Sequence, residues 1–156
     1  MSTFRQCSYV AAVCIFFTTA AEGLAEDVVI GDRVLHVADG YEVSLAVPSS
    51  LAERPIAVAR DEQGRLYVTD SGGMTERAEK QLEEKPHRIR RLTDTDGDGV
   101  YDQSTLFADR MMFPEGCLWF RGSLYVAAPP EIWKLTDTND DGVCDKREVW
   151  FNGTTL

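Results

Sequence analysis

Hydrophobic and polar positions alternate in short runs along most of this chain. Residues 41–47 alternate with period two, which is the pattern of a strand with one buried face. Residues 56–59 and 66–68 are apolar runs separated by the turn signal Asp61-Glu-Gln-Gly64. The same pattern predicts further strands over residues 88–93, 104–108, 116–120, 124–126, 132–136 and 148–151. The charged stretch 77–84 predicts a short helix instead.

The strand pattern occurs twice. Gly64-Arg-Leu-Tyr-Val68 corresponds to Gly122-Ser-Leu-Tyr-Val126, an offset of 58 residues. Ile89 and the residues up to Asp94 correspond to Ile132 and the residues up to Asp137, an offset of 43. The difference indicates an insertion of about 15 residues in the first copy, and it must lie near residues 71–88.

Each copy contains four short strands joined by turns. Repeated four-stranded units of this length are the blades of β-propellers. The sequence therefore predicts an all-β fold, the first two four-stranded blades of an incomplete propeller. Blade one spans about residues 54–109 and blade two about 113–152, within a propeller region of 41–156 that follows a lead-in of 26–40. Since propellers have about 4–8 blades, we expect the chain to be a fragment of a longer protein.

Residues 1–25 have the features of a secretory signal peptide. Arg5 precedes an apolar run over residues 9–21, and the small residues Gly23 and Ala25 follow. The run is short for a membrane span, so we predict export to the periplasm or the extracellular space. An uncleaved anchor, which would associate the protein with a membrane, is the alternative.

The charge is concentrated in two places. The chain has a net charge of -10, and segments 94–105 and 137–148 hold nine of its 26 acidic residues. Because nucleic-acid binding needs a basic face, this distribution argues against it. Of the four cysteines, Cys117 and Cys144 follow the signal peptide, and their spacing matches no zinc or haem motif. An exported chain permits a disulfide between them without requiring one.

An acidic nine-residue loop occurs in each copy, over residues 94–102 (loop one) and 137–145 (loop two). Oxygen-bearing side chains at positions 1, 3, 5 and 9, a glycine at position 6 and a carbonyl at position 7 are what a calcium ion needs from a short loop. The predicted metal ligands are Asp94, Asp96, Asp98, the Val100 carbonyl and Asp102 in loop one, and Asp137, Asn139, Asp141, the Val143 carbonyl, Asp145 and Glu148 in loop two.

Loop two is predicted to be the stronger calcium site. Glu148 stands at position 12, where calcium loops carry a bidentate carboxylate, whereas loop one has Thr105 there. Pro86 and Pro130 leave no room for the helix that precedes an EF-hand loop, so we expect both loops to join strands. Bound calcium would then be structural rather than catalytic. The alternative is that both are hairpin turns without metal, because Asp and Gly dominate turns for backbone reasons.

Several segments resemble a known family. They are residues 39–47, residues 54–68, the stretch from Arg88 through the first acidic loop to Gly116, and residues 124–137. Over residues 39–153 the chain resembles the N-terminal propeller of the bacterial membrane-bound dehydrogenase family. That propeller is similar to those of soluble quinoprotein glucose and sorbosone dehydrogenases, which hold pyrroloquinoline quinone over a central funnel.

The resemblance implies a six-bladed propeller in a full-length parent that oxidises a sugar or alcohol. It also implies partners for this chain, namely the remaining blades and a c-type cytochrome domain that accepts electrons. His87 and Arg88 lie on the loop that would face the funnel, which makes them candidate cofactor contacts. Two blades without a haem motif form no complete funnel, so we expect this chain alone to be inactive, and no catalytic residue is identified.

A second hypothesis belongs to another functional class. A calcium-stabilised propeller that binds carbohydrate or protein, with no enzymatic activity, has the same sequence features, because a fold does not determine a function.

Overall fold

The structure is a computed structural model that describes residues 26–73 and 75–154. The predicted signal peptide lies outside the described residues. The chain divides into two compact units, Met1–Ser44 and Leu45–Leu156. In the first unit, β1 (Glu26–Ile30) and β2 (Arg33–Val37) form an antiparallel hairpin that the sequence analysis did not predict. The imidazole of His36 hydrogen-bonds the Asp27 carboxylate across this hairpin.

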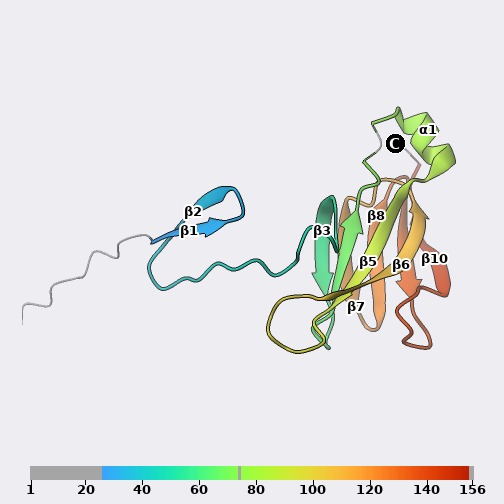
Figure 1. The fold of residues 1–156 in the computed structure, drawn as a ribbon. Helices are drawn as coiled ribbons and strands as arrows, with labels where there is room; N and C mark the ends of the chain where they lie inside the picture. Colours follow the sequence, from blue (N-terminus) through green and yellow to red (C-terminus); the bar gives the residue numbers. More distant parts are fainter. Residues whose placement is uncertain (1–25, 74, 155–156) are drawn as a thin grey trace, which may run out of the picture. The chain divides into compact units, whose positions relative to one another are not determined.

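The second unit contains two four-stranded antiparallel sheets and one short helix (Figure 1). The first sheet consists of β3 (Pro55–Arg60), β4 (Leu66–Asp70), β5 (His87–Thr93) and β6 (Gln103–Met111). The second sheet consists of β7 (Gly116–Phe120), β8 (Ser123–Ala128), β9 (Glu131–Thr136) and β10 (Lys146–Asn152). These sheets confirm the all-β prediction and the order of strands within each copy.

The helix α1 (Ala78–Glu84) lies in the segment where the insertion was predicted, between β4 and β5. It ends at Lys85, which has a left-handed backbone conformation with φ 47° and whose amide bonds the Gln81 carbonyl. No helix in the described part of the chain is long and apolar enough to cross a membrane.

Consecutive strands are neighbours in each sheet, so their connections alternate between the two ends. The β5–β6 connection is loop one and the β9–β10 connection is loop two, and both lie at the end opposite α1 (Figure 1). The topology therefore brings the two acidic loops to one end of the second unit.

The two sheets pack through different faces. Tyr67 of β4 points into the interface, and its ring stacks on Trp119 of β7 with centroids 4.7 Å apart. On the second sheet, Leu124 and Val126 of β8 point into the same interface and are fully buried. Tyr125, which is the equivalent of Tyr67 in the repeat, consequently lies on the opposite face of the second sheet. The first sheet thus presents its tyrosine face to the second, and the tyrosine face of the second sheet is open.

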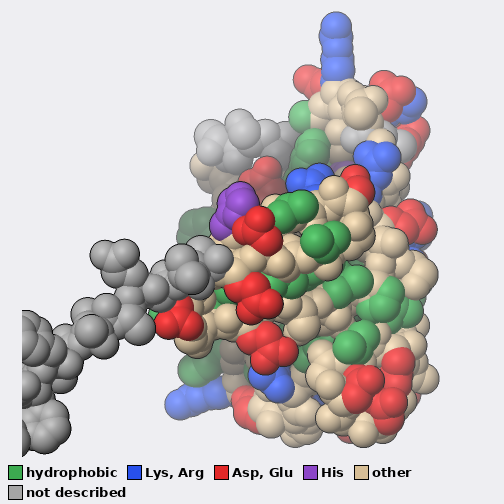
Figure 2. Space-filling view, turned by 60° about the vertical axis from the view of Figure 1, so that its left-hand side comes forward, with side chains coloured by type: hydrophobic (Ala, Val, Ile, Leu, Met, Phe, Trp, Pro, Cys, Tyr) green, Lys and Arg blue, Asp and Glu red, His purple; other side chains and the backbone are tan. Residues whose placement is uncertain are grey.

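Both outer faces of the pair carry apolar side chains that water reaches. On the second sheet, Leu118, Phe120 and Trp150 are 63%, 53% and 62% exposed and surround Tyr125. On the first sheet, Val47 and Ala52 cover part of the outer face near Val68. Figure 2 shows further hydrophobic side chains dispersed over the visible surface, with acidic side chains gathered at its lower right.

The prediction of a strand over residues 41–47 was wrong. The segment is irregular, with Tyr41 N donating to the Ala38 carbonyl (3.2 Å) and the Ala46 carbonyl accepting from Tyr101 N (2.8 Å). An alternating pattern becomes a strand only where a neighbouring strand satisfies its backbone groups. In the described structure, these residues have no such neighbour.

Truncating a side chain in the sheet interface should destabilise the protein strongly. Leu135 is fully buried between the sheets, so Leu135→Ala should lower the free energy of unfolding by about 2–5 kcal/mol in urea titrations. Leu118→Ala makes the same chemical change on the open face and should cost less than about 0.5 kcal/mol. Equal losses in both variants would contradict the packing described here.

Candidate functional site

The two acidic loops share one backbone arrangement. In loop one, Gly99 N donates to Asp94 Oδ2 (3.0 Å), and in loop two Gly142 N donates to Asp137 Oδ2 (2.8 Å). Both glycines have positive φ, 90° and 94°, a conformation that favours glycine over other residues. The glycine at position 6 therefore turns its amide toward the first carboxylate of the loop in both copies.

Position 9 closes each loop. The Asp102 carboxylate accepts from the hydroxyl of Thr95 (2.5 Å), and the Asp145 carboxylate accepts from that of Thr138 (2.8 Å). Position 5 is used in the same way, because Asp98 accepts from the Val100 amide (2.7 Å) and the equivalent bond in loop two is 2.8 Å long. These acidic residues thus order the turns whether or not a cation binds.

Loop one brings three carboxylates together. One oxygen from each of Asp94, Asp96 and Asp98 lies within 4.8 Å of the other two, and no second group of this kind occurs among the residues that the structure describes. The Gly99 amide holds the pKa of the Asp94 carboxyl below its usual value. Asp96 and Asp98 are exposed, so solvent screens their mutual repulsion. Loop one is therefore an exposed acidic cluster.

Loop two differs because its first carboxylate is buried. The Asp137 side chain is 5% exposed, and its Oδ2 accepts from the Gly142 amide. Its Oδ1 is buried and has no hydrogen-bond partner among the described residues. In loop one, the corresponding Asp94 oxygen accepts from Gly97 N (2.7 Å). Asp137 therefore carries a buried, negatively charged oxygen that lacks the partner its counterpart has.

Glu148, the predicted twelfth ligand, lies in β10 beside two lysines. Its carboxylate oxygen is 3.1 Å from Lys146 Nζ and 3.7 Å from Lys134 Nζ. The neighbouring Lys146 ammonium holds the pKa of Glu148 below its usual value. Within the described residues, Glu148 joins no cluster of three potential metal ligands. Its Oε2 is buried, as Asp137 Oδ1 is, and has ion-pair contacts with these lysines but no hydrogen bond among the described residues.

Two arginines, Arg65 in the turn between β3 and β4 and Arg91 in β5, reach loop two, and the sequence analysis missed both. Arg65 Nη1 is 2.5 Å from Asp140 Oδ1, and this bond holds the pKa of Asp140 below its usual value. Arg91 Nη1 is 3.3 Å from Asp137 Oδ2 and 3.5 Å from Asp140 Oδ1. A sequence offers no signal for such pairs, because Arg91 and Asp137 are 46 positions apart. Loop two therefore sits against the first sheet through ion pairs.

His87, a predicted cofactor contact, is buried between other protein groups. Gly72 N donates to Nδ1 (3.1 Å), so Nε2 carries the proton and donates to Gln81 Oε1 (2.8 Å). Burial lowers the pKa of the imidazole, which favours this neutral form. The ring also lies 5.2 Å from that of Phe113. In this arrangement both ring nitrogens are used to hold α1 and the β4–α1 connection.

Arg88, the second predicted cofactor contact, pairs with acidic residues. Its Nε donates to Asp70 Oδ2 (2.8 Å), and its Nη2 lies 3.4 Å from Glu53. Asp70 also accepts from the Arg54 amide (2.8 Å). Burial would raise the pKa of Asp70, but the hydrogen bond from Arg88 and the others it receives hold that pKa below its usual value. Arg88 therefore neutralises a buried carboxylate in this structure.

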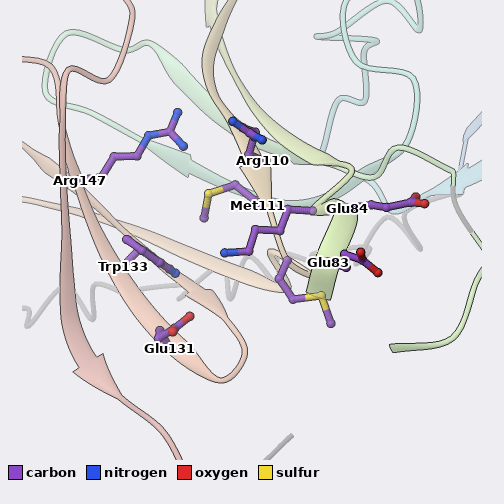
Figure 3. Close-up of a pocket in the computed structure, with 9 residues that line it drawn as sticks. Glu83, Glu84, Arg110, Met111, Glu131, Trp133 and Arg147 are labelled. Carbon is purple, nitrogen blue, oxygen red and sulfur yellow. The ribbon is translucent and has the colours of Figure 1, made fainter. Parts of the chain in front are cut away.

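A hollow of about 370 Å³ lies between the end of α1 and strands β6, β9 and β10 (Figure 3). It is lined by acidic and basic side chains in equal number together with Trp133, Met111 and Met112. Arg147 is already held by Asp109, with Nη2 3.0 Å from Oδ1. Because the charges are mixed, the hollow favours neither an anion nor a cation.

The two cysteines outside the signal region are free thiols. Cys144 is buried and Cys117 partly so, and burial raises the pKa of Cys117 to about 11. Their thiols are therefore in the protonated form, which is neither a good nucleophile nor a metal ligand.

The loops, the paired arginines and the two sheets are all contained in one family match. Residues 32–156 match a family described as Domain of unknown function (DUF7133). The chain belongs to the DUF7133 family. A comparison with curated proteins found no match. The DUF7133 region covers both sheets and both acidic loops, so the candidate metal site belongs to the family domain.

Acidification should destabilise the fold through His87. Its pKa is lower in the folded state than the value of about 6.5 expected on unfolding, so the unfolded state binds the proton more readily. The stabilisation is complete above about pH 6.5 and is lost as the pH falls. In urea titrations, the free energy of unfolding should be about 1 kcal/mol lower at pH 5.5 than at pH 7.5. This loss is about the net contribution of a single hydrogen bond.

A matched variant isolates this effect. His87→Gln carries no group that titrates in this range and should show a smaller difference between the two pH values. A wild-type protein equally stable at both pH values would contradict the assignment of a buried neutral imidazole.

Proposed function

We propose that this DUF7133 chain is a calcium-binding module in which a Ca²⁺ ion at loop two stabilises the contact between two stacked sheets. The observation that carries the proposal is the buried Asp137 carboxylate with one oxygen unpartnered among the described residues. A buried anionic oxygen without a partner is costly, and a hard cation is a ligand that removes this cost.

The remaining donors of loop two suit calcium. Asn139 and Asp141 follow Asp137 at alternate positions, and the Val143 carbonyl stands at position 7. All are oxygen donors, which calcium prefers over nitrogen and sulfur. With Glu148 engaged by lysines, the site has few carboxylates, so we expect weak binding with a dissociation constant on the order of 10⁻⁴ M.

Calcium at this place would stabilise more than the loop. Asp137 and Asp140 are ion-paired with Arg91 of the first sheet, and Cys144 N donates to the Phe107 carbonyl of β6 (2.8 Å). Ordering loop two therefore orders a contact between the sheets. Binding to the folded state alone stabilises that state in proportion to occupancy.

We also propose that the two sheets are propeller blades. Support comes from the stacking described above, in which the tyrosine face of the first sheet is covered by the second. The equivalent face around Tyr125 is apolar and exposed, as expected for a surface that a further blade covers. The remaining blades would be the partners of this chain in a longer protein.

The quinone-dependent sugar or alcohol dehydrogenase remains a proposal for a full-length parent and rests on the resemblance alone. His87 and Arg88 make hydrogen bonds to protein groups in this structure, so no described contact favours them as quinone ligands. Export, a cytochrome partner and the substrate class are likewise predictions that rest on the sequence.

Calcium titration of the purified protein by calorimetry tests the proposed function. Wild type should bind calcium weakly at loop two, and Asp137→Asn should weaken that binding further, by at least about tenfold, because the neutral amide loses the charge that attracts the cation. Asp109→Asn removes the same charge from an exposed pair with Arg147 and should change little. Glu148→Gln should also change little, since Glu148 lies with lysines.

The interpretation requires a folded sample, checked by near-ultraviolet circular dichroism. Absence of binding by a folded protein would overturn the proposal and leave loop two as a turn. Equal weakening by Asp109→Asn and Asp137→Asn would indicate a general charge effect and would also contradict it.

The blade proposal predicts that the open face of the second sheet makes an interface. At high concentration the protein should self-associate through this face, and Leu118→Lys should reduce association measured by sedimentation velocity. Leu106→Lys places the same charge on another exposed apolar position, 45% exposed, and should have a smaller effect. Association unchanged by Leu118→Lys would argue against this interface.

A further inference from the structure

Arg91 lies where a cation bound to loop two would meet it. It belongs to β5 of the first sheet, is paired in register with Tyr67, and so points toward the second sheet. Its side chain is 11% exposed. A Cβ atom added at Gly142 would overlap the Arg91 guanidinium, which shows how closely the arginine covers the loop. Arg91 therefore contributes a fixed positive charge at the site.

The Arg91–Asp137 pair contains two buried polar atoms that lack hydrogen-bond partners among the described residues. Arg91 Nε is a donor and Asp137 Oδ1 an acceptor, and within the described residues neither has a hydrogen-bond partner. The existing contact is one-sided, from Arg91 Nη1 to Asp137 Oδ2 at 3.3 Å. An arginine and a carboxylate commonly pair through two parallel hydrogen bonds. One small rearrangement of the pair would therefore satisfy both atoms without a cation.

Calcium and the two-bond arginine pair would each need Oδ1 of Asp137, which cannot serve both at once. A cation on Oδ1 satisfies the carboxylate but leaves Arg91 Nε unpartnered and places two positive groups close together. A two-bond Arg91–Asp137 pair satisfies both side chains and takes the oxygen that the cation needs. Loop one offers the contrast, because no ion pair in the described structure involves Asp94, Asp96, Asp98 or Asp102.

We infer that Arg91 is an intramolecular competitor of calcium at loop two and sets the affinity of the site. In the absence of calcium, Arg91 neutralises Asp137 and keeps the loop against the first sheet. When calcium binds Oδ1, Arg91 is restricted to Oδ2 of Asp137 and to Asp140. This inference rests on the proposed calcium site. It makes calcium occupancy and the contact between the sheets interdependent.

The substitution Arg91→Gln distinguishes competition from positioning. If Arg91 competes, the variant should bind calcium more tightly than wild type, by roughly tenfold for removal of one nearby charge in a solvent-accessible site. If Arg91 merely positions Asp137, the same substitution should weaken binding. Arg91→Lys retains the charge but loses the planar fork, and it should bind with intermediate affinity.

Arg147→Gln is the matched control, because it removes the same charge from a pair with Asp109. Its calcium affinity should stay within about threefold of wild type, an allowance for weak surface electrostatics. Stability provides the second measurement. Without calcium, Arg91→Gln should have a lower urea midpoint of unfolding than wild type. Saturating calcium should reduce this difference between the two midpoints.

The two ways of failing are distinguishable. Calcium binding by wild type with equal or weaker binding by Arg91→Gln would overturn the competition and leave the calcium site standing. Absence of binding by folded wild type, Arg91→Lys and Arg91→Gln would overturn the calcium site and this inference with it.

Discussion

The packing of the two sheets through unlike faces is the constraint on which the rest of the structure depends. Tyr67 on one sheet meets Trp119, Leu124 and Val126 on the other, and the fully buried side chains of the second unit lie mainly there. Because the faces differ, the arrangement does not close on itself with two sheets. It buries one tyrosine face and leaves the equivalent one, around Tyr125, open.

The position of the acidic loops follows from this packing. Consecutive antiparallel strands place both loops at one end of the molecule, but only loop two lies against a preceding sheet. That neighbour removes Asp137 from solvent and supplies Arg91 and Arg65. The same nine-residue motif is therefore an exposed acidic cluster in one copy and, in the other, an ion-paired loop whose first carboxylate is buried. Tertiary surroundings, more than the motif, decide what each loop can do.

The elements that the sequence predicted well are those fixed by local chemistry. Strands β3 to β10 follow from alternating apolar residues bounded by glycine and aspartate turns, and the loop geometry follows from Gly99 and Gly142. Where a feature of the fold depends on residues far apart in the sequence, the sequence alone did not predict it. Residues 41–47 have the pattern of a strand but no partner strand, and the β1–β2 hairpin gave too weak a pattern to be predicted.

In the candidate site, too, some features follow from the local sequence and others depend on distant residues. The predicted ligands of loop two are adjacent in sequence, so their common location was predictable. Glu148, at the twelfth position, lies in β10, which begins at Lys146, and its role as a ligand stays a prediction. The burial of Asp137 and its contact with Arg91 join segments 46 positions apart, which no local pattern encodes.

The open face of the second sheet carries a basic residue at the position that corresponds to Arg91. Lys134 is the counterpart of Arg91 in the second copy, and its register with Tyr125 places it on that face, as the register of Arg91 with Tyr67 does in the first. Lys134 lies 3.7 Å from Glu148. A further unit stacked in the same way would bring its own loop against Lys134, just as loop two meets Arg91. In the two sheets described here, Arg91 on the tyrosine face meets loop two in this way. The positive charge that attracts the loop would lower its affinity for a cation, so in the proposed calcium site the contact between the sheets and metal binding oppose each other electrostatically.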